Sequence, residues 1–177
     1  MSYSGDRILL ANEREGKASR YRAWVVVCVA LGSILFQVYV PRHIAFLGFL
    51  EMPLLVTVYF ALVWRSQIGG LLIGAVIGLA QDSLSPHPLG MFGIIKTLVG
   101  YFSASVGVRI DVDHPFVRLL LGWFFFIFHQ VVFWVMTRAL LGRPLVLDWA
   151  RTGIEGLLNG IVGVALFLFL DRLRQRN

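Results

Sequence analysis

The stretch GGLLIGAVIGLAQDSLSPHPLGMFGIIKTLVGY, residues 69–101, decides how the rest of the chain is arranged. Its first half carries three glycines and an aspartate at intervals of four, which on one helix lie along one side: Gly70, Gly74, Gly78 and Asp82. Each interior glycine would weaken a water-soluble helix by about 1 kcal/mol relative to alanine. In lipid, however, a glycine stripe lets a second backbone approach closely and gain dispersion contacts. Two prolines near the middle break helical hydrogen bonding, so we predict a helical hairpin with a polar tip.

The composition of the whole chain indicates a membrane protein. Hydrophobic residues make up 58% of the sequence and charged residues 15%, whereas a soluble domain is about 45–50% apolar. Several apolar runs approach the roughly 20 residues that a helix needs to cross the hydrocarbon core. We therefore predict an all-α polytopic membrane protein, a six-helix bundle with spans at residues 23–40, 44–64, 67–80, 89–108, 116–141 and 149–170. The corresponding domains are a basic arm (1–22), a membrane domain (23–172) and a basic tail (173–177).

The basic residues predict the orientation of the chain. The net charge of +6 is concentrated at the chain ends and in short loops, so it does not indicate nucleic-acid binding. With six spans both ends share a side, which holds eleven Arg or Lys residues against four on the other, Lys96 lying within a span. The positive-inside rule then places both termini in the cytoplasm and the hairpin tip outside. Cys28 is the only cysteine, which excludes an intrachain disulfide.

The second span has an interrupted pattern. Glu51 and Pro53 lie inside residues 44–64, and proline is favoured in the first turn of a helix. A regular helix beginning near Met52 would have about 13 residues, near 20 Å, which is shorter than the ~30 Å core. The residues before it should be shielded by protein, because irregular backbone cannot face lipid.

Two charged side chains fall inside spans at matching depth, roughly 10 Å below the outer interface at 1.5 Å per residue. Since an intramembrane charge costs at least ~2.5–3.5 kcal/mol on insertion scales, we predict that Lys96 and Glu155 come close, directly or through water. The first interpretation is an ion pair between the fourth and sixth helices, and the second is a solvated cavity that opens outward and binds a headgroup or small solute. The third is no contact. The candidate outward pocket consists of Asp82, Lys96, Glu155 and Asn159.

A second packing stripe accompanies Glu155 in the last span, where Asn159 shares its face and three small residues adjoin it: Gly156, Gly160 and Gly163. His129 lies near mid-depth in the fifth span, where a hydrogen-bonded histidine is more common than a proton relay or a metal ligand. Asp82, beside two serines at a helix end, is expected to stabilise the tip through local hydrogen bonds.

The sequence carries no recognisable motif for catalysis. The chain has no H-E-x-x-H, no P-loop and no G-x-G-x-x-G. Asp82, Ser83 and His87 lie too close in sequence to indicate a triad. We therefore predict no catalytic, cofactor-binding or metal-binding residues.

Five short motifs occur in a fixed order between residue 40 and about 175, before a last apolar run and a basic tail. They are P-L-L-V-T-V-Y-F-A-L from 53, G-x3-G-L-x2-D-x-L-S from 74, P-L-G from 88, L-V-G-Y from 98, and E-x3-N from 155. In these motifs and their order the chain resembles the rod shape-determining MreD family of bacterial inner-membrane proteins. One departure concerns an acidic residue that usually follows the family's proline, whereas here Glu51 precedes Pro53.

The resemblance implies a non-enzymatic component of the cell-elongation machinery in the inner membrane. Such proteins pair with the bitopic protein MreC and act with MreB, RodA and a class B penicillin-binding protein in peptidoglycan synthesis and cell-shape control. Their fold is similar to the substrate-binding components of energy-coupling-factor transporters. Two functions follow: a scaffold whose glycine stripes and aromatic faces dock MreC, with lipid around it, or a small-molecule-binding component of a vitamin-type transporter.

Overall fold

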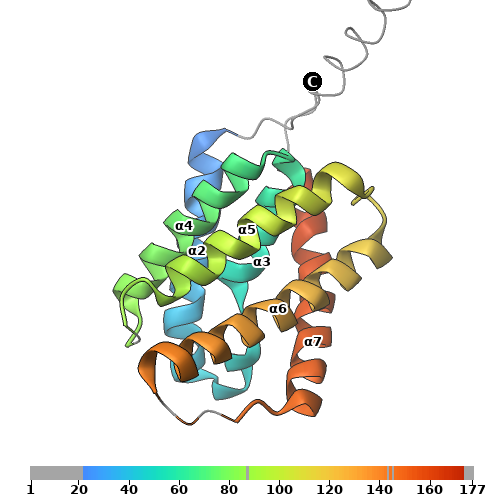
Figure 1. Cartoon of the computed structure of the whole chain (residues 1–177). Helices are drawn as coiled ribbons and strands as arrows, with labels where there is room; N and C mark the ends of the chain where they lie inside the picture. Colours follow the sequence, from blue (N-terminus) through green and yellow to red (C-terminus); the bar gives the residue numbers. More distant parts are fainter. Residues whose placement is uncertain (1–21, 87, 143, 145, 174–177) are drawn as a thin grey trace, which may run out of the picture.

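The computed structural model describes residues 22–173 apart from 87, 143 and 145, and this part of the chain is helical with short connections. The predicted arm (1–22) and tail (173–177) therefore lie almost wholly outside the described residues. Six segments are long and apolar enough to cross a membrane, which confirms the predicted all-α membrane architecture (Figure 1). The elements are α2 (Ala23–His43), a 3-10 helix η1 (Ala45–Phe49), α3 (Met52–Trp64), α4 (Gln67–Leu84), α5 (Met91–Arg109), α6 (Pro115–Leu141) and α7 (Trp149–Arg172).

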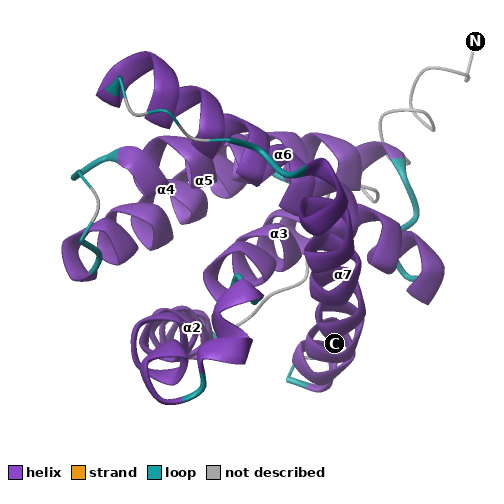
Figure 2. Ribbon diagram, turned by 90° about the horizontal axis from the view of Figure 1, so that it is seen from below, coloured by secondary structure: helices purple, strands orange, loops and turns teal. Residues whose placement is uncertain are grey.

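The short helix α3 forms the core of the bundle. It has 13 residues with Pro53 in its first turn, as the sequence predicted, and its ten residues 53–62 are all buried. Figure 2 shows α3 in the middle of the other helices, with α2 at the edge. Helix α3 packs against α2, α4, α5, α6 and α7. The prediction that protein shields the segment before it is wrong, because among residues 44–51 only Leu50 is buried. The backbone of this segment is instead satisfied by its own 3-10 hydrogen bonds and by the Asn159 side chain.

The hairpin of α4 and α5 is held together by the glycine stripe. A Cβ atom built on Gly70, Gly74 or Gly78 would overlap the carbonyl oxygen of Gly100, Lys96 or Phe92, respectively, on α5. Backbone-to-backbone packing of this kind requires glycine, since any side chain would push the helices apart. The stripe is therefore filled by a neighbouring helix of the same chain.

Helix α4 extends four residues beyond the predicted end at residue 80, so Asp82 lies in its last turn. Nothing in residues 81–84 interrupts the helix, and the first proline, Pro86, restricts only the residue before it. Helix α5 begins at Met91, after a turn in which Gly90 adopts a positive φ of 92°.

A second close approach joins α6 to α7. The ideal Cβ of Gly160 would lie 2.8 Å from the carbonyl oxygen of Leu119, and that of Gly122 would lie 3.1 Å from the Cα of Gly160. Gly156 packs under Trp123, and Gly163 faces Leu55 of α3. The small residues of α7 are thus also covered by helices of this chain.

At the end of the bundle where α3 and α7 finish, a buried ion pair joins three helices. The Arg118 Nη1 donates to the Asp171 Oδ2 at 2.6 Å, and the Tyr59 hydroxyl donates to the Asp171 Oδ1 at 2.7 Å. The Arg118 Nε donates to the carbonyl oxygen of Val112. The sequence analysis predicts no contact between these residues. It includes Arg118 only among the basic residues of the cytoplasmic side, because a charge near the end of a span is ordinarily a topology signal.

Candidate functional site

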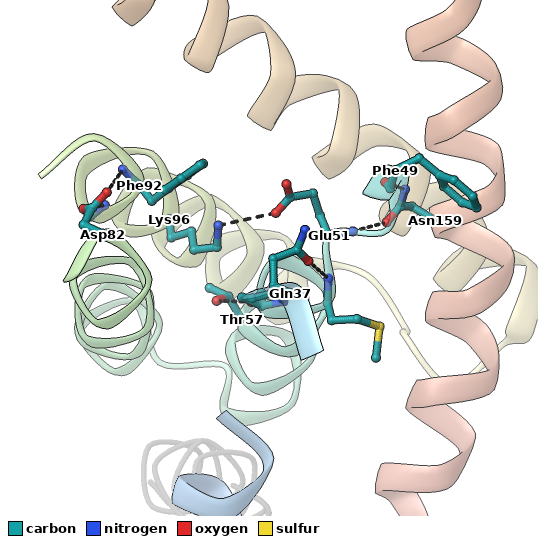
Figure 3. Close-up of polar contacts among 11 residues, drawn as sticks. Gln37, Phe49, Glu51, Thr57, Asp82, Phe92, Lys96 and Asn159 are labelled. Carbon is teal, nitrogen blue, oxygen red and sulfur yellow. Dashed lines mark hydrogen bonds and ion pairs between the residues drawn. The ribbon is translucent and has the colours of Figure 1, made fainter. Parts of the chain in front are cut away.

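The intramembrane charges meet between the hairpin and the start of α3. Lys96, whose side chain is fully buried, points from α5 toward Glu51, and its Nζ lies 3.8 Å from the Glu51 Oε2 (Figure 3). The same Nζ lies 4.7 Å from the ring centroid of Phe92, in cation–π geometry. Burial of a lysine at this depth is tolerated because a carboxylate and an aromatic face replace part of its hydration.

The predicted contact between Lys96 and Glu155 is wrong. Glu155 instead accepts a hydrogen bond from the Arg151 Nε at 2.7 Å, one turn earlier on α7. The two depths match, but α3 packs against both α5 and α7. Figure 3 shows Glu51 between Lys96 of α5 and Asn159 of α7. Equal depth in the membrane does not determine toward which neighbouring helix a side chain points, and Lys96 points toward Glu51.

Asn159 fixes the backbone that presents Glu51. Its Oδ1 accepts from the Glu51 backbone N–H at 2.9 Å, and its Nδ2 donates to the carbonyl oxygens of Phe49 and Glu155. The next amide, that of Met52, donates to the Gln37 Oε1 at 3.2 Å. The predicted assignment of Asn159 to an outward pocket is wrong, because this side chain is fully buried and its amide is used to cap irregular backbone.

Asp82 is used in the same way, as an acceptor for backbone N–H groups. Its Oδ2 accepts from the backbone N–H groups of Gly90 and Gly93, and its Oδ1 accepts from that of Phe92, at 2.9–3.0 Å (Figure 3). These are free donors at the start of α5, so a buried carboxylate of α4 caps the neighbouring helix. Asp82 therefore stabilises the tip as predicted, through hydrogen bonds that join the end of α4 to the start of α5.

A cavity of about 810 Å³ lies at the end of the bundle opposite the chain ends. Of the four predicted pocket residues only Glu155 lines it. The lining comes from η1, the start of α7 and the middle of α6: Ala45, Phe46, Gly48, Phe49, Glu51, Gln130, Arg151, Ile154 and Glu155. The cavity therefore shares only Glu155 with the predicted pocket, and its other polar side chains are those of Glu51, Gln130 and Arg151.

Several buried polar atoms near this site have no hydrogen-bond partner among the described residues: Glu51 Oε2, Gln81 Oε1, Lys96 Nζ, Ser103 Oγ and both ring nitrogens of His129. The expected hydrogen bond of His129 is thus absent from the described part of the chain. Its ring instead stacks on Phe92, with centroids 6.1 Å apart and planes 3° apart. These residues can make ionic and hydrogen-bonding contacts. Among the described residues, no three His, Cys, Asp or Glu side chains lie close enough together to hold a metal ion.

Comparison with protein families matches the chain to a family model described as rod shape-determining protein MreD, over residues 18–176. The chain belongs to the MreD family. Membership implies a role in rod shape determination, and with the six apolar helices it indicates a multi-pass membrane protein. No curated protein and no solved structure matches the chain. The likeness to energy-coupling-factor components therefore stays a prediction.

Glu51 is the residue that sequence reasoning missed. Glu51 lies directly before Pro53, whereas the MreD family pattern has an acidic residue after the proline, so the resemblance gave Glu51 no role. The structure gives it the ion pair with Lys96, held by the Asn159 contact. The signal in the sequence was the charge itself: an acid directly before a helix that is too short to span requires a buried partner, and Lys96 was the only Lys or Arg placed deep within a span.

Proposed function

We propose that this chain is a non-enzymatic scaffold of the cell-elongation machinery, which binds the single transmembrane helix of MreC and supports peptidoglycan synthesis. MreB, RodA and a class B penicillin-binding protein are its further partners. Membership in the MreD family carries this proposal. The positions of Asn159 and Asp82 are compatible with it, because both side chains bind backbone groups of neighbouring segments.

The partner helix is expected at α2 and not at the glycine stripes. Those stripes are filled by α5 and α6, so they offer no room for another chain. Helix α2 is the least covered span, since 17% of its apolar window is buried against 61% for residues 45–64. One stripe of α2 is exposed and apolar: Trp24, Val27, Leu31, Leu35 and Tyr39. Spacings of three and four residues form a continuous helix-docking face.

The proposed location is the bacterial inner membrane with both termini in the cytoplasm. The excess of basic residues on the side of the chain ends supports this orientation. The cavity beside Glu51 and Glu155 then opens toward the outer leaflet, and the Arg118–Asp171 pair lies near the cytoplasmic surface.

Copurification with MreC tests the proposal. The tagged full chain should retain MreC in mild detergent, and Leu35→Trp on the α2 face should reduce the retained amount roughly tenfold, the scale of a disrupted interface centre. Leu72→Trp is the matched control, because Leu72 is an exposed leucine of α4. Equal retention by the two variants would contradict docking on α2, and no retention by the unsubstituted chain would contradict the scaffold.

The second candidate function is a small-molecule-binding component of a vitamin-type transporter. The cavity of about 810 Å³ favours it, since pockets for small ligands are typically about 300–1,000 Å³. Coupled transport requires an energising ATPase pair, so this function predicts that an ATPase and a retained small molecule copurify in place of MreC.

A further inference from the structure

The cavity beside Glu51 carries a specific arrangement of charge that the scaffold function does not use. Its wall presents two carboxylates, those of Glu51 and Glu155, and one guanidinium, that of Arg151. The Gln130 amide adds a neutral acceptor and donor. Each carboxylate already has one cation of the chain, Lys96 or Arg151, so a ligand that fits this wall adds a hydrogen-bond-donating cationic group to their remaining oxygens and an anionic group to the guanidinium.

Arg151 is placed to bind an anion. Its side chain is 76% exposed, and its Nε donates to Glu155. This bond fixes the plane of the guanidinium. Its two terminal nitrogens have no acceptor among the described residues and can donate to a ligand. A guanidinium with two free N–H₂ groups matches the oxygens of a phosphate.

Glu51 is placed to bind a cation. Its side chain is 16% exposed and belongs to the cavity wall, while its Oε2 is buried against Lys96. That oxygen faces Lys96, so a ligand in the cavity reaches this carboxylate only through its other oxygen, Oε1. The rings of Phe46 and Phe49, in edge-to-face contact at 5.4 Å, line the same cavity and attract a cation through their faces.

We propose that this cavity binds the headgroup of a zwitterionic phospholipid with a primary ammonium group, that is, a phosphoethanolamine headgroup. Its ammonium lies against Glu51 and Glu155, and its phosphate lies against Arg151. The exposed apolar side chains of Phe46 and Ile154 at the rim contact the start of the acyl chains. A primary ammonium donates three hydrogen bonds to carboxylates, whereas a quaternary ammonium donates none. An anionic headgroup without a cation leaves the two carboxylates facing negative charge.

Lipid retention by the full chain tests this proposal independently of MreC. The protein is reconstituted in vesicles of phosphatidylethanolamine and phosphatidylglycerol in equal amounts with matched acyl chains, extracted gently, and examined by native mass spectrometry. The expected result is a retained lipid enriched roughly tenfold in phosphatidylethanolamine, the scale of a charge-assisted hydrogen bond. Replacing phosphatidylethanolamine by phosphatidylcholine should abolish the enrichment.

Two variants separate the proposed contacts. Glu155→Gln should reduce the preference for phosphatidylethanolamine, and Arg151→Gln should reduce retention of both lipids. Arg138→Gln is the control. Arg138 is an exposed arginine near the C-terminal end of α6, its guanidinium lies over the Trp134 ring, and it does not line this cavity. Equal amounts of the two lipids on the unsubstituted protein would overturn the proposal, and so would retention that neither variant changes. If a variant unfolds, the phosphatidylcholine arm on the unsubstituted chain still decides the question.

Soluble glycerophosphoethanolamine distinguishes a lipid from a free ligand. Displacement of the retained lipid by millimolar amounts of it would support recognition through the headgroup. Binding of the soluble compound without any preference among the lipids would overturn the lipid as the ligand. Failure to retain MreC leaves these measurements unaffected, so the two proposals fail separately.

Discussion

Gly74→Ala is expected to lower the free energy of unfolding by about 3 kcal/mol, at the upper end of overpacking effects. The added methyl group would overlap the backbone carbonyl of Lys96, which lies in a helix and has no rotamer to move away. Helices α4 and α5 must therefore separate along their length, which also displaces the Lys96 side chain from Glu51. The measurement is unfolding of the detergent-solubilised full chain in SDS, followed by tryptophan fluorescence.

Gly32→Ala is the matched control for this change. Gly32 lies in α2 with no atom within 4 Å of the position of its Cβ, so the substitution should alter stability by less than about 0.5 kcal/mol beyond the gain in helix propensity. If Gly74→Ala and Gly32→Ala proved equally stable, α4 and α5 would not be in backbone contact.

Lys96→Met is expected to destabilise the chain by about 3–5 kcal/mol, because it leaves the Glu51 carboxylate buried without its cation. Adding Glu51→Leu should restore most of this loss, since replacing both members of a buried ion pair with apolar groups is often neutral. The free energies of unfolding of the two single variants and the double variant give the coupling energy directly.

Glu155→Leu supplies the control for the cycle. Combined with Lys96→Met it should give no recovery, because Glu155 pairs with the exposed Arg151. Recovery with Glu155→Leu but not with Glu51→Leu would restore the contact that the sequence first suggested and would contradict the site described above.

The architecture followed from apolar run lengths and small-residue spacing, because both are local properties. Six spans, the short α3 starting at Pro53, and the glycines of α4 on one face are all read along single helices. The end of α4 was predicted too early, because the sequence shows where a proline forbids a helix and not how far the helix runs before it.

The site was harder to predict because it depends on which helices are neighbours. Lys96 was recognised as a buried charge that needs a partner, but depth along the helices pointed to Glu155, and only the position of α3 next to α5 brings Glu51 to Lys96. Asn159 and Asp82 were recognised as polar residues within the bundle, yet their partners are backbone groups of other segments. Any residue can supply such groups, so they leave no sequence signal.

The central claim is that the glycine stripes are closed within the chain and that α2 is the face for the partner helix. Crosslinking from Cys28, an exposed residue of α2 and the only cysteine of the chain, tests it most directly. With single cysteines placed along the MreC transmembrane helix, mild oxidation in membranes should give disulfides from Cys28 with a helical period. A cysteine at position 72 of α4, in a Cys28→Ser background, should give none. Crosslinks from position 72 without crosslinks from Cys28 would contradict the account.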